Sequence, residues 1–351
     1  MAFPRVILVG TVALFTVIGI AGTVKKVFFS PKAEKTVALA PATPSPVLPP
    51  ASPKAPVAQP LAPVSSVPKT EPPSVALKPK LAAAQPAQQE GRLPQVDRIQ
   101  QLFTTGPTKL PIVETISYSS QVPWLKGRPA WVGDYASYYS TSRHFIARGL
   151  NGKPDYVTQK VSPGSKFNVF RKDKNFQFHL LVDVQQRQMA FYYIDLDTNE
   201  RVLLKVYDVG LGKPGETASG TLTPLGKYLL GDKIAVYKPG IMGLFHEQQV
   251  EMIRVFGTRW IPFGKEIGSC TAPAKGYGIH GAPWTSDKKT GKWTELRQTI
   301  GQYDSDGCIR LSYPDMEELF SIVVTKPTVI EIVKNSKDAK LPGVEVTSPM
   351  R

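Results

Sequence analysis

The sequence predicts a mainly β domain with a short helix, preceded by a small helical or α+β module and an N-terminal transmembrane helix. Three observations support this fold class. Val- and Ile-rich segments follow Phe176, aromatic residues recur at helical spacing before them, and an uncharged apolar run lies near the start. The expected segments of the chain are 1–30, 31–92, 93–166, 167–336 and a C-terminal tail at 337–351.

The first segment carries an apolar run that is long enough to cross a membrane. Residues 6–24 read VILVGTVALFTVIGIAGTV, which is 19 residues without a charge, and about 20 apolar residues span a bilayer as a helix. A cleaved signal peptide, with small residues at 19–21 as the cleavage point, is the alternative. The length favours an uncleaved anchor, although Lys25 and Lys26 oppose a cytoplasmic N-terminus under the positive-inside rule.

The second segment, 31–92, is a proline-rich linker. Residues 38–89 hold fourteen of the 33 prolines and no aromatic residue. Proline fixes φ and removes a hydrogen-bond donor, and nothing in the stretch could bury an apolar face. We therefore expect a disordered, extended spacer.

The third segment, 93–166, predicts a small accessory module. Four aromatic residues at helical spacing predict core contacts: Trp131, Tyr135, Tyr138 and Tyr139. The later stretch FIARGLNGKPDYVTQKVSPGSKFNVF resembles a degenerate LysM module, with a helix, an Asn-Gly turn and a Pro-Gly turn before an apolar strand.

The fourth segment, 167–336, holds the strands. The candidates are FQFHLLVDV, RQMAFYYID, RVLLKVYDVG, VEMIRVF and PTVIEIV. One helix is predicted after Ser312 as its N-cap, with Asp315 three residues later. Its apolar stripe consists of Met316, Leu319, Phe320 and Val323.

Composition narrows the classes of partner. The net charge of +15 and the pI near 9.6 favour an anionic polymer or surface. No zinc-finger spacing or RNA-binding aromatic signature is present, so nucleic acid is not expected. Two cysteines are too few for a disulfide framework, and four scattered histidines predict neither a metal site nor a cofactor.

Cys308 and His280 are the candidate catalytic pair. Cys308 lies in SDGCIRL, and His280 precedes Gly281 in GYGIHGAPW. Only a thiolate attacks, so a nucleophilic cysteine needs a base, and imidazole has a suitable pKa. Gly307 allows a substrate to approach the backbone and frees nearby N–H groups to bind an oxyanion. Spacing alone also fits a buried structural cysteine and an unrelated core histidine.

A resemblance favours the catalytic alternative. IHGAPW followed by SDGCIRL, with the upstream hairpin GTLTPLGKYLLG, resembles the paired signature of the L,D-transpeptidase (YkuD-type) catalytic domain. The resemblance covers about residues 168–334 and implies a β-sandwich. It also implies a thiol acyltransferase that cross-links peptidoglycan stem peptides through a thioester, without a cofactor.

The resemblance implies a role for each residue of the motif. Cys308 would be the nucleophile, His280 the base, and the Gly281 carbonyl would hold the imidazole. The N–H groups of Gly307 and Cys308 would receive the oxyanion. Arg310 would bind a substrate carboxylate, or form a structural ion pair with an aspartate at 304 or 306. Ser305 would bond either the turn or the histidine.

Asp306 is where the sequence departs from the family, which most often has a second histidine there. A carboxylate beside Cys308 should raise the pKa of the thiol, unless it pairs with His280 or Arg310 first. We therefore expect Asp306 to be an orienting or substrate-pocket residue.

Further residues near the motif have two interpretations each. Cys270 is either a buried free thiol or a disulfide partner of Cys308. Trp260, Tyr277 and Trp284 either wall the cleft or belong to the core.

A peptidoglycan substrate implies a single-pass protein of the bacterial inner membrane, with its catalytic domain in the periplasm. Two rival functions remain open. One is an L,D-carboxypeptidase or amidase-type hydrolase of the same fold, and the other is a non-catalytic anchor that binds the cell wall.

Overall fold

The computed structural model describes residues 92–151, 161–232 and 234–346, all within one compact unit, Leu81–Arg351. The predicted anchor, nearly all of the predicted linker and the last residues of the tail lie outside the described residues. None of the helices in the described ranges is long and apolar enough to span a bilayer.

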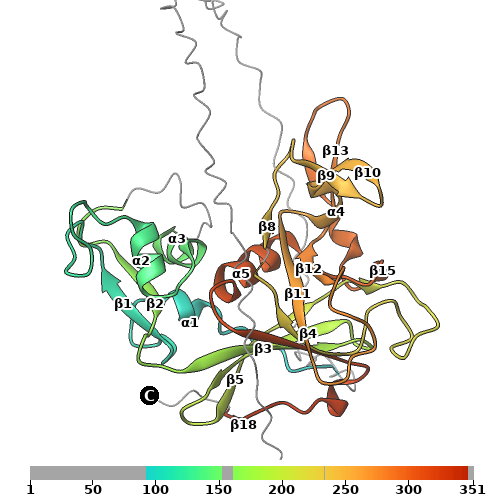
Figure 1. The fold of residues 1–351 in the computed structure, drawn as a ribbon, viewed down its shortest axis with the longest axis horizontal. Helices are drawn as coiled ribbons and strands as arrows, with labels where there is room; N and C mark the ends of the chain where they lie inside the picture. Colours follow the sequence, from blue (N-terminus) through green and yellow to red (C-terminus); the bar gives the residue numbers. More distant parts are fainter. Residues whose placement is uncertain (1–91, 152–160, 233, 347–351) are drawn as a thin grey trace, which may run out of the picture. The chain divides into compact units, whose positions relative to one another are not determined.

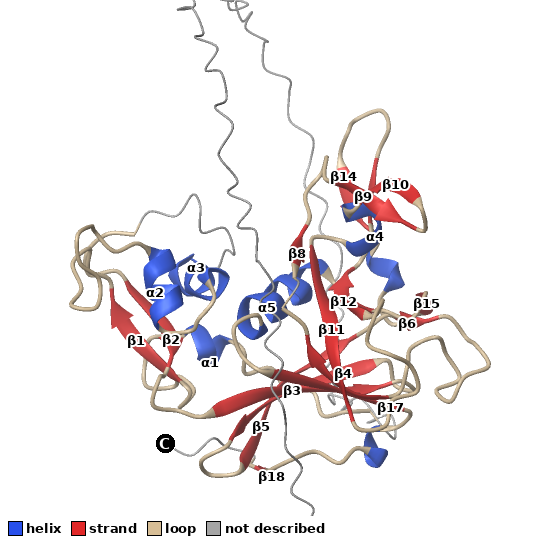
Figure 2. Ribbon diagram, viewed as in Figure 1, coloured by secondary structure: helices blue, strands red, loops and turns tan. Residues whose placement is uncertain are grey.

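The described chain is mainly β with few helices, as predicted (Figure 1, Figure 2). A ten-stranded sheet has the order β16-β12-β11-β7-β17-β3-β4-β5-β18, and β8 pairs with β11 beside this path. In chain order these strands are β3 Phe176–Asp183, β4 Gln188–Asp195, β5 Glu200–Asp208, β7 Gly226–Leu230, β8 Ala235–Val236, β11 Arg259–Ile267, β12 Gly278–Gly281, β16 Ile309–Leu311, β17 Thr328–Val333 and β18 Val344–Glu345.

Smaller elements surround this sheet. β6 Leu211–Gly212 pairs with β15 Tyr303–Ser305, β9 Met242–Phe245 with β10 Gln248–Glu251, and β13 Trp284–Ser286 with β14 Trp293–Glu295. Two short 3-10 helices are η1 Arg297–Thr299 and η2 Ser336–Asp338. A short helix, α4 Ile253–Phe256, contacts both β10 and β13 (Figure 2).

The apolar runs of β3 and β4 are buried on both faces. Phe178 and Phe191 join the main core, whereas Leu181 and Tyr192 belong to a second cluster on the opposite face. Successive side chains of a strand point to opposite faces. A strand that is covered on both sides therefore reads as a continuous apolar run rather than an alternating one.

β11 bends the sheet. Its first residues pair with β12 and β8, and its later residues pair with β7, with a register shift between Phe263 and Lys265. Such irregularities bend a strand and let it pass from one layer to the next. The two layers expected of a sandwich are thus parts of one curled sheet that share β11.

Helix α5, Tyr313–Val323, confirms the predicted amphipathic helix. Ser312 occupies the N-cap position, but its hydroxyl bonds the Asp315 carboxylate at 2.5 Å instead of a backbone N–H. The predicted apolar stripe is buried in the main core. The helix packs against β11 and β12 (Figure 1), so it supports the strand that carries His280.

The predicted strand VEMIRVF is only half correct. Its beginning belongs to β10, but the chain then turns into α4 and leaves it at Gly257, which has φ +62°. A Cβ at Gly257 would lie 2.6 Å from the Ala282 carbonyl oxygen. This close backbone contact requires a glycine at position 257 and sets the local structure. The β propensity of the surrounding residues gives no indication of it.

The N-terminal part of the described chain forms an α+β arrangement. Its elements are α1 Gln100–Phe103, β1 Val113–Ser117, α2 Val132–Tyr138, α3 Arg143–Asn151 and β2 Lys166–Phe170, and β1 pairs with β2. Tyr135 is buried as predicted. Trp131, the N-cap residue of α2, is 70% exposed, so its predicted core contact is wrong. The LysM-like interpretation includes residues 152–160, which lie outside the described ranges, and it stays a prediction.

Candidate active site

Two neighbouring parallel strands carry the candidate pair. β12 pairs with β16 so that His280 lies opposite Arg310. Ile279 and Ile309 are buried in the main core, so the residues that alternate with them project from the other face. Cys308, one residue before β16, is in phase with Arg310. The fold therefore places Cys308 and His280 on one face, diagonally across adjacent strands.

His280 is held as a neutral imidazole. It is only 3% exposed, and its Nδ1 lies 2.8 Å from the Gly281 carbonyl oxygen. Its pKa is lowered to about 3, mainly by burial; the Gly281 hydrogen bond opposes this effect, and the positive charge of Arg310 adds a smaller lowering effect. A carbonyl can only accept, so Nδ1 carries the proton and Nε2 is the free base.

Aromatic rings fix the orientation of this imidazole. The Phe256 ring stands at 87° to it with centroids 5.2 Å apart, and the Trp260 ring lies at 5.9 Å. Trp260 is the register partner of His280 on β11. Trp260 thus walls the site, one of the two interpretations that the sequence allowed.

The thiol of Cys308 is also neutral at rest. The residue is half-buried, and its Sγ lies 3.7 Å from the Gly276 carbonyl oxygen. The pKa of Cys308 is raised to about 11, mainly by burial. The Gly278 N–H and Arg310 oppose this rise with smaller lowering effects, and Asp306 adds a small raising effect. A nucleophilic thiolate must therefore arise by proton transfer, because almost no thiolate exists at neutral pH.

The turn before Cys308 requires a glycine. Gly307 has φ +114°, and a Cβ there would lie 2.6 Å from the Tyr277 ring and 2.7 Å from the Leu222 carbonyl oxygen. Ser305 is buried and bonds this turn rather than His280. Its Oγ accepts the Gly307 N–H at 3.1 Å and donates to the Cys308 carbonyl at 2.7 Å.

These bonds bear on the expected oxyanion donors. The Gly307 N–H already has a partner in Ser305. The Cys308 N–H has no hydrogen-bond partner within the described ranges. Of the two predicted donors, only the Cys308 N–H is without a partner among the described residues.

Arg310 forms the ion pair that the sequence left as an alternative. Its Nη1 bonds the Asp304 carboxylate. The side chain is 15% exposed, and its Nε is buried without a hydrogen-bond partner in the part of the chain described. The guanidinium therefore keeps unsatisfied donor capacity beside Cys308 and His280.

Asp306 pairs with neither His280 nor Arg310. It is 58% exposed, bonds Lys213 at 3.0 Å, and lies 3.9 Å from His246 Nε2. Exposed pairs of this kind contribute little to stability, on the order of 0–1 kcal/mol. The sequence carried no signal for Lys213 or His246, because both lie far from the motif.

The remaining candidates separate in space. Cys270 and Cys308 are both free thiols, and Cys270 Sγ bonds the Lys227 carbonyl at 3.2 Å. Tyr277 packs on Gly307. Trp284 instead packs on Tyr313, with ring centroids 5.4 Å apart, and not on the predicted pair.

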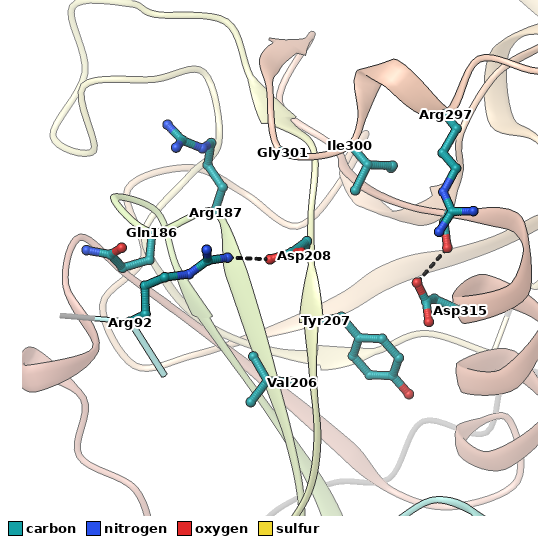
Figure 3. A pocket seen from close by; sticks show the side chains of 11 residues that line it. Arg92, Gln186, Arg187, Val206, Tyr207, Asp208, Arg297, Ile300, Gly301 and Asp315 are labelled. Atoms are coloured by element: carbon teal, nitrogen blue, oxygen red, sulfur yellow. Dashed lines mark hydrogen bonds and ion pairs between the residues drawn. The ribbon is translucent and has the colours of Figure 1, made fainter. Parts of the chain in front are cut away.

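The structure also contains a cavity away from Cys308 and His280. A space of about 500 Å³ is lined on one side by Arg92, which bonds Asp208, and on the other by Arg297 and by Asp315, whose carboxylate bonds Ser312 (Figure 3). None of the predicted site residues lines it. Nowhere in the described ranges do three or more His, Cys, Asp or Glu side chains come together to hold a metal ion.

Comparisons with known proteins agree with the fold of this site. Residues 177–332 match the family model of the YkuD L,D-transpeptidase catalytic domain. No curated protein matches the chain.

Similar solved structures include three with low identity. Bd1075 of Bdellovibrio bacteriovorus is 16% identical with a TM-score of 0.31, covering 45% of this chain and 48% of that one. The helical cell shape determining protein Pgp2 of Campylobacter jejuni is 17% identical with a TM-score of 0.30, covering 48% and 51%. L,D-transpeptidase 3 of Mycobacterium tuberculosis, in complex with a faropenem-derived adduct, is 11% identical with a TM-score of 0.26, covering 49% and 76%. The chain thus covers about half the length of Bd1075 and about half the length of Pgp2.

Proposed function

Because residues 177–332 match the family model of the YkuD L,D-transpeptidase catalytic domain, we propose that the protein cross-links peptidoglycan stem peptides through a thioester on Cys308. The observation that carries this proposal is the shared face of β12 and β16, which holds a neutral imidazole and a thiol on adjacent strands. The free Nε2 of His280 is the base that such a thiol needs.

The first half of the reaction forms the thioester. The Cys308 proton passes to His280 Nε2 while Sγ attacks the carbonyl carbon of the third stem residue. The Cys308 N–H stabilises the resulting oxyanion. As the tetrahedral intermediate collapses, the C–N bond breaks and the amine of the terminal D-alanine leaves with the proton from His280.

The second half consumes the thioester. An amine of a neighbouring stem attacks the same carbonyl carbon and gives a proton to His280. The C–S bond then breaks, and the sulfur recovers a proton from the imidazolium. If water replaces the amine, the same intermediate yields a hydrolase, so the acceptor alone separates the two outcomes.

Charged residues beside the pair suit a substrate with carboxylates. Among the described residues, Arg310 Nε is buried and has no hydrogen-bond partner, while Nη1 pairs with Asp304. We assign substrate carboxylate binding to Arg310 and the ordering of the turn to Ser305. Asp306 is given a place at the pocket rim, because Lys213 and not His280 neutralises it.

The location follows from the substrate. Peptidoglycan lies outside the cytoplasm, so residues 1–30 would anchor the chain in the bacterial inner membrane with the catalytic domain in the periplasm. The net charge of +15 suits an anionic wall polymer. Neither a metal nor a nucleotide takes part in the proposed steps.

The test combines acylation with product analysis. A carbapenem-type acylating agent should add one covalent group to the wild-type protein by intact mass, and none to Cys308→Ala. Cys270→Ala is the matched control and should be acylated like the wild type. With purified stem tetrapeptide, a cross-linked dimer supports transfer, whereas tripeptide alone supports hydrolysis. Absence of both adduct and turnover would favour the non-catalytic wall-binding alternative.

A further inference from the structure

A second cavity lies beside the N-terminal end of α5, separate from the catalytic pair. It has a volume of about 240 Å³. We call it the aromatic pocket, and define it by its four rings and its charged floor: Tyr237, Trp284, Trp293, Tyr313, Arg259 and Glu317. No step of the proposed reaction uses these residues.

The β13–β14 hairpin sets both indoles on one face. Trp284 lies opposite Glu295, and Trp293 lies opposite Ser286. Residues directly opposite in an antiparallel pair share a face, as do residues two positions apart. Both tryptophans are half-buried, whereas the threonines between them are exposed. The hairpin therefore turns two large rings toward the cavity.

These rings are held rigidly. Trp284 stands edge-on to Tyr313 at 88°. The Arg254 guanidinium lies 4.6 Å from the Trp293 ring centroid. Arg254 is itself fixed by bonds to Ser286 Oγ at 2.6 Å and to Glu251 at 3.0 Å. A preformed wall of this kind loses little entropy when a ligand binds.

The floor is polar and mostly neutralised. Arg259 donates from Nε and Nη2 to Glu317 Oε2, at 3.1 and 2.8 Å, and Thr258 donates to Glu317 Oε1 at 2.6 Å. Glu317 is 4% exposed. Arg259 Nη1 makes no hydrogen bond within the described ranges and is not sealed from solvent, so it remains a donor at the cavity.

This combination selects the class of ligand. An aromatic cage can bind a cation, but here Arg254 already places a positive charge against the Trp293 ring, Arg259 neutralises Glu317, and Lys238 adds positive charge at the rim, so a further cation would be repelled. An anion would face ring faces of negative potential and a guanidinium that is already paired. A neutral ligand with a flat apolar face and a polar edge fits both walls and floor.

A sugar ring has this chemistry, because its C–H groups form an apolar face and its hydroxyl and acetamido groups form a polar edge. We infer that the aromatic pocket binds a pyranose ring of a glycan strand. The inference rests on the proposed function only in the choice of glycan, namely the one that carries the stem peptides.

The pocket lies along the strands that carry the catalytic pair. Trp284 follows β12 by three residues, and Tyr313 follows β16 by two. Cys308 and Tyr313 are five residues apart, which spans at most about 17 Å of extended chain. A glycan held in the pocket would therefore keep its attached peptide near Cys308.

The test uses a sugar without any peptide. Chitotetraose is titrated against the full-length protein, with tryptophan fluorescence and calorimetry as readouts. Saturable binding is expected, and Trp293→Ala and Tyr313→Ala should each weaken it at least tenfold. Trp131→Ala is the matched control, because Trp131 is exposed on α2 and away from the pocket; it should bind like the wild type.

Other outcomes would overturn the inference. One is absence of chitotetraose binding to the wild type. The other is an affinity for chitotetraose that is unchanged from the wild type in both Trp293→Ala and Tyr313→Ala, whose folding is verified by thermal melting. Stronger binding of sugar-free stem tetrapeptide, lost in Trp293→Ala, would make the pocket a peptide site instead. Cys308→Ala should still bind chitotetraose. Sugar binding without any acylation of the wild type would refute the proposed function and leave the pocket inference standing.

Discussion

The neutral thiol of Cys308 makes its reactivity depend on pH in a specific way. Burial raises its pKa to about 11, so the thiolate fraction should rise about tenfold per pH unit below that value. In a Cys270→Ala background, we expect iodoacetamide alkylation of Cys308 to increase up to about pH 11 without an earlier plateau. A plateau below pH 8 would instead indicate a resting thiolate–imidazolium pair.

Two charges near the thiol should act in opposite directions. Arg310 lowers the pKa of Cys308, and Asp306 raises it by a smaller effect. Arg310→Gln should therefore slow alkylation at pH 8, and Asp306→Ala should speed it slightly. Asp306→Asn is the matched isostere and should behave like Asp306→Ala. If both Asp306 variants leave the pH profile unchanged, Asp306 does not tune the thiol.

Burial of His280 should also affect acid stability. Its pKa falls from 6.5 to about 3 on folding, so the folded protein binds fewer protons than the unfolded chain between these values. Its stabilising contribution is complete above pH 6.5 and is lost as the pH falls toward 3, by up to about 1.4 kcal/mol per pH unit. Urea unfolding of wild type and His280→Gln at pH 7, 5.5 and 4.5 should converge on acidification. Parallel pH dependence of the two would contradict this.

The sequence singled out Cys308 and His280 because their signals are local. A His-Gly at a strand end and a Gly-Cys before an apolar run identify two strand ends, whereas the pairing of the two residues came from the family resemblance, because spacing alone also fitted unrelated residues. The partners of these residues could not be predicted in the same way. Lys213 bonds Asp306 across 93 residues, and Tyr277 packs on Gly307. Neither contact leaves a pattern in either segment.

At the scale of elements, the turn before β16 depends on space as well as on backbone conformation. Gly307 and Gly301 both have positive φ, but only a Cβ at Gly307 would clash with neighbouring atoms. Gly301→Ala should cost roughly 1–3 kcal/mol of backbone strain and keep Cys308 acylation. Gly307→Ala should reduce acylation at least a hundredfold. Intact-mass kinetics measure both, and equal rates would show that the turn tolerates a side chain.

The strands and α5 could be predicted because burial dictates their sequence. The apolar runs of β3, β4 and β17 are covered on both faces or lie in the core, and the stripe of α5 faces that core. The helix α4 could not be predicted from IRVF, which has strand composition. Contact between Gly257 and the backbone after β12 overrides that preference.

At the scale of the whole molecule, one core joins the N-terminal described elements to the ten-stranded sheet. Leu102, Phe103 and Phe145 pack in the same cluster as Phe178 and Phe320. Ser142 Oγ also bonds the Ser321 carbonyl of α5 at 2.5 Å. The accessory segment predicted at 93–166 therefore shares its interior with the domain that follows it.

This shared core predicts the effect of truncation. A chain that begins at residue 167 loses several large apolar side chains from the core, each worth about 1.5–3 kcal/mol on burial. It should melt at least 10 °C lower, or aggregate. A chain that begins at residue 92 is the control and should melt like the full protein in a single transition. Equal melting of both shortened chains would mean that the two parts fold independently.

The parallel pairing of β12 with β16 has a consequence for how such a protein can diversify. Parallel strands cannot be joined by a tight turn, so the chain must make a long excursion between Gly281 and Ile309. That excursion carries the β13–β14 hairpin and its two tryptophans. Insertions or exchanges within it would alter what is held beside α5 and leave the register of His280 against Arg310 intact. Changes in the β13–β14 hairpin can thus alter the proposed glycan pocket without moving the strands that position His280 and Cys308, although one continuous stretch of chain carries both.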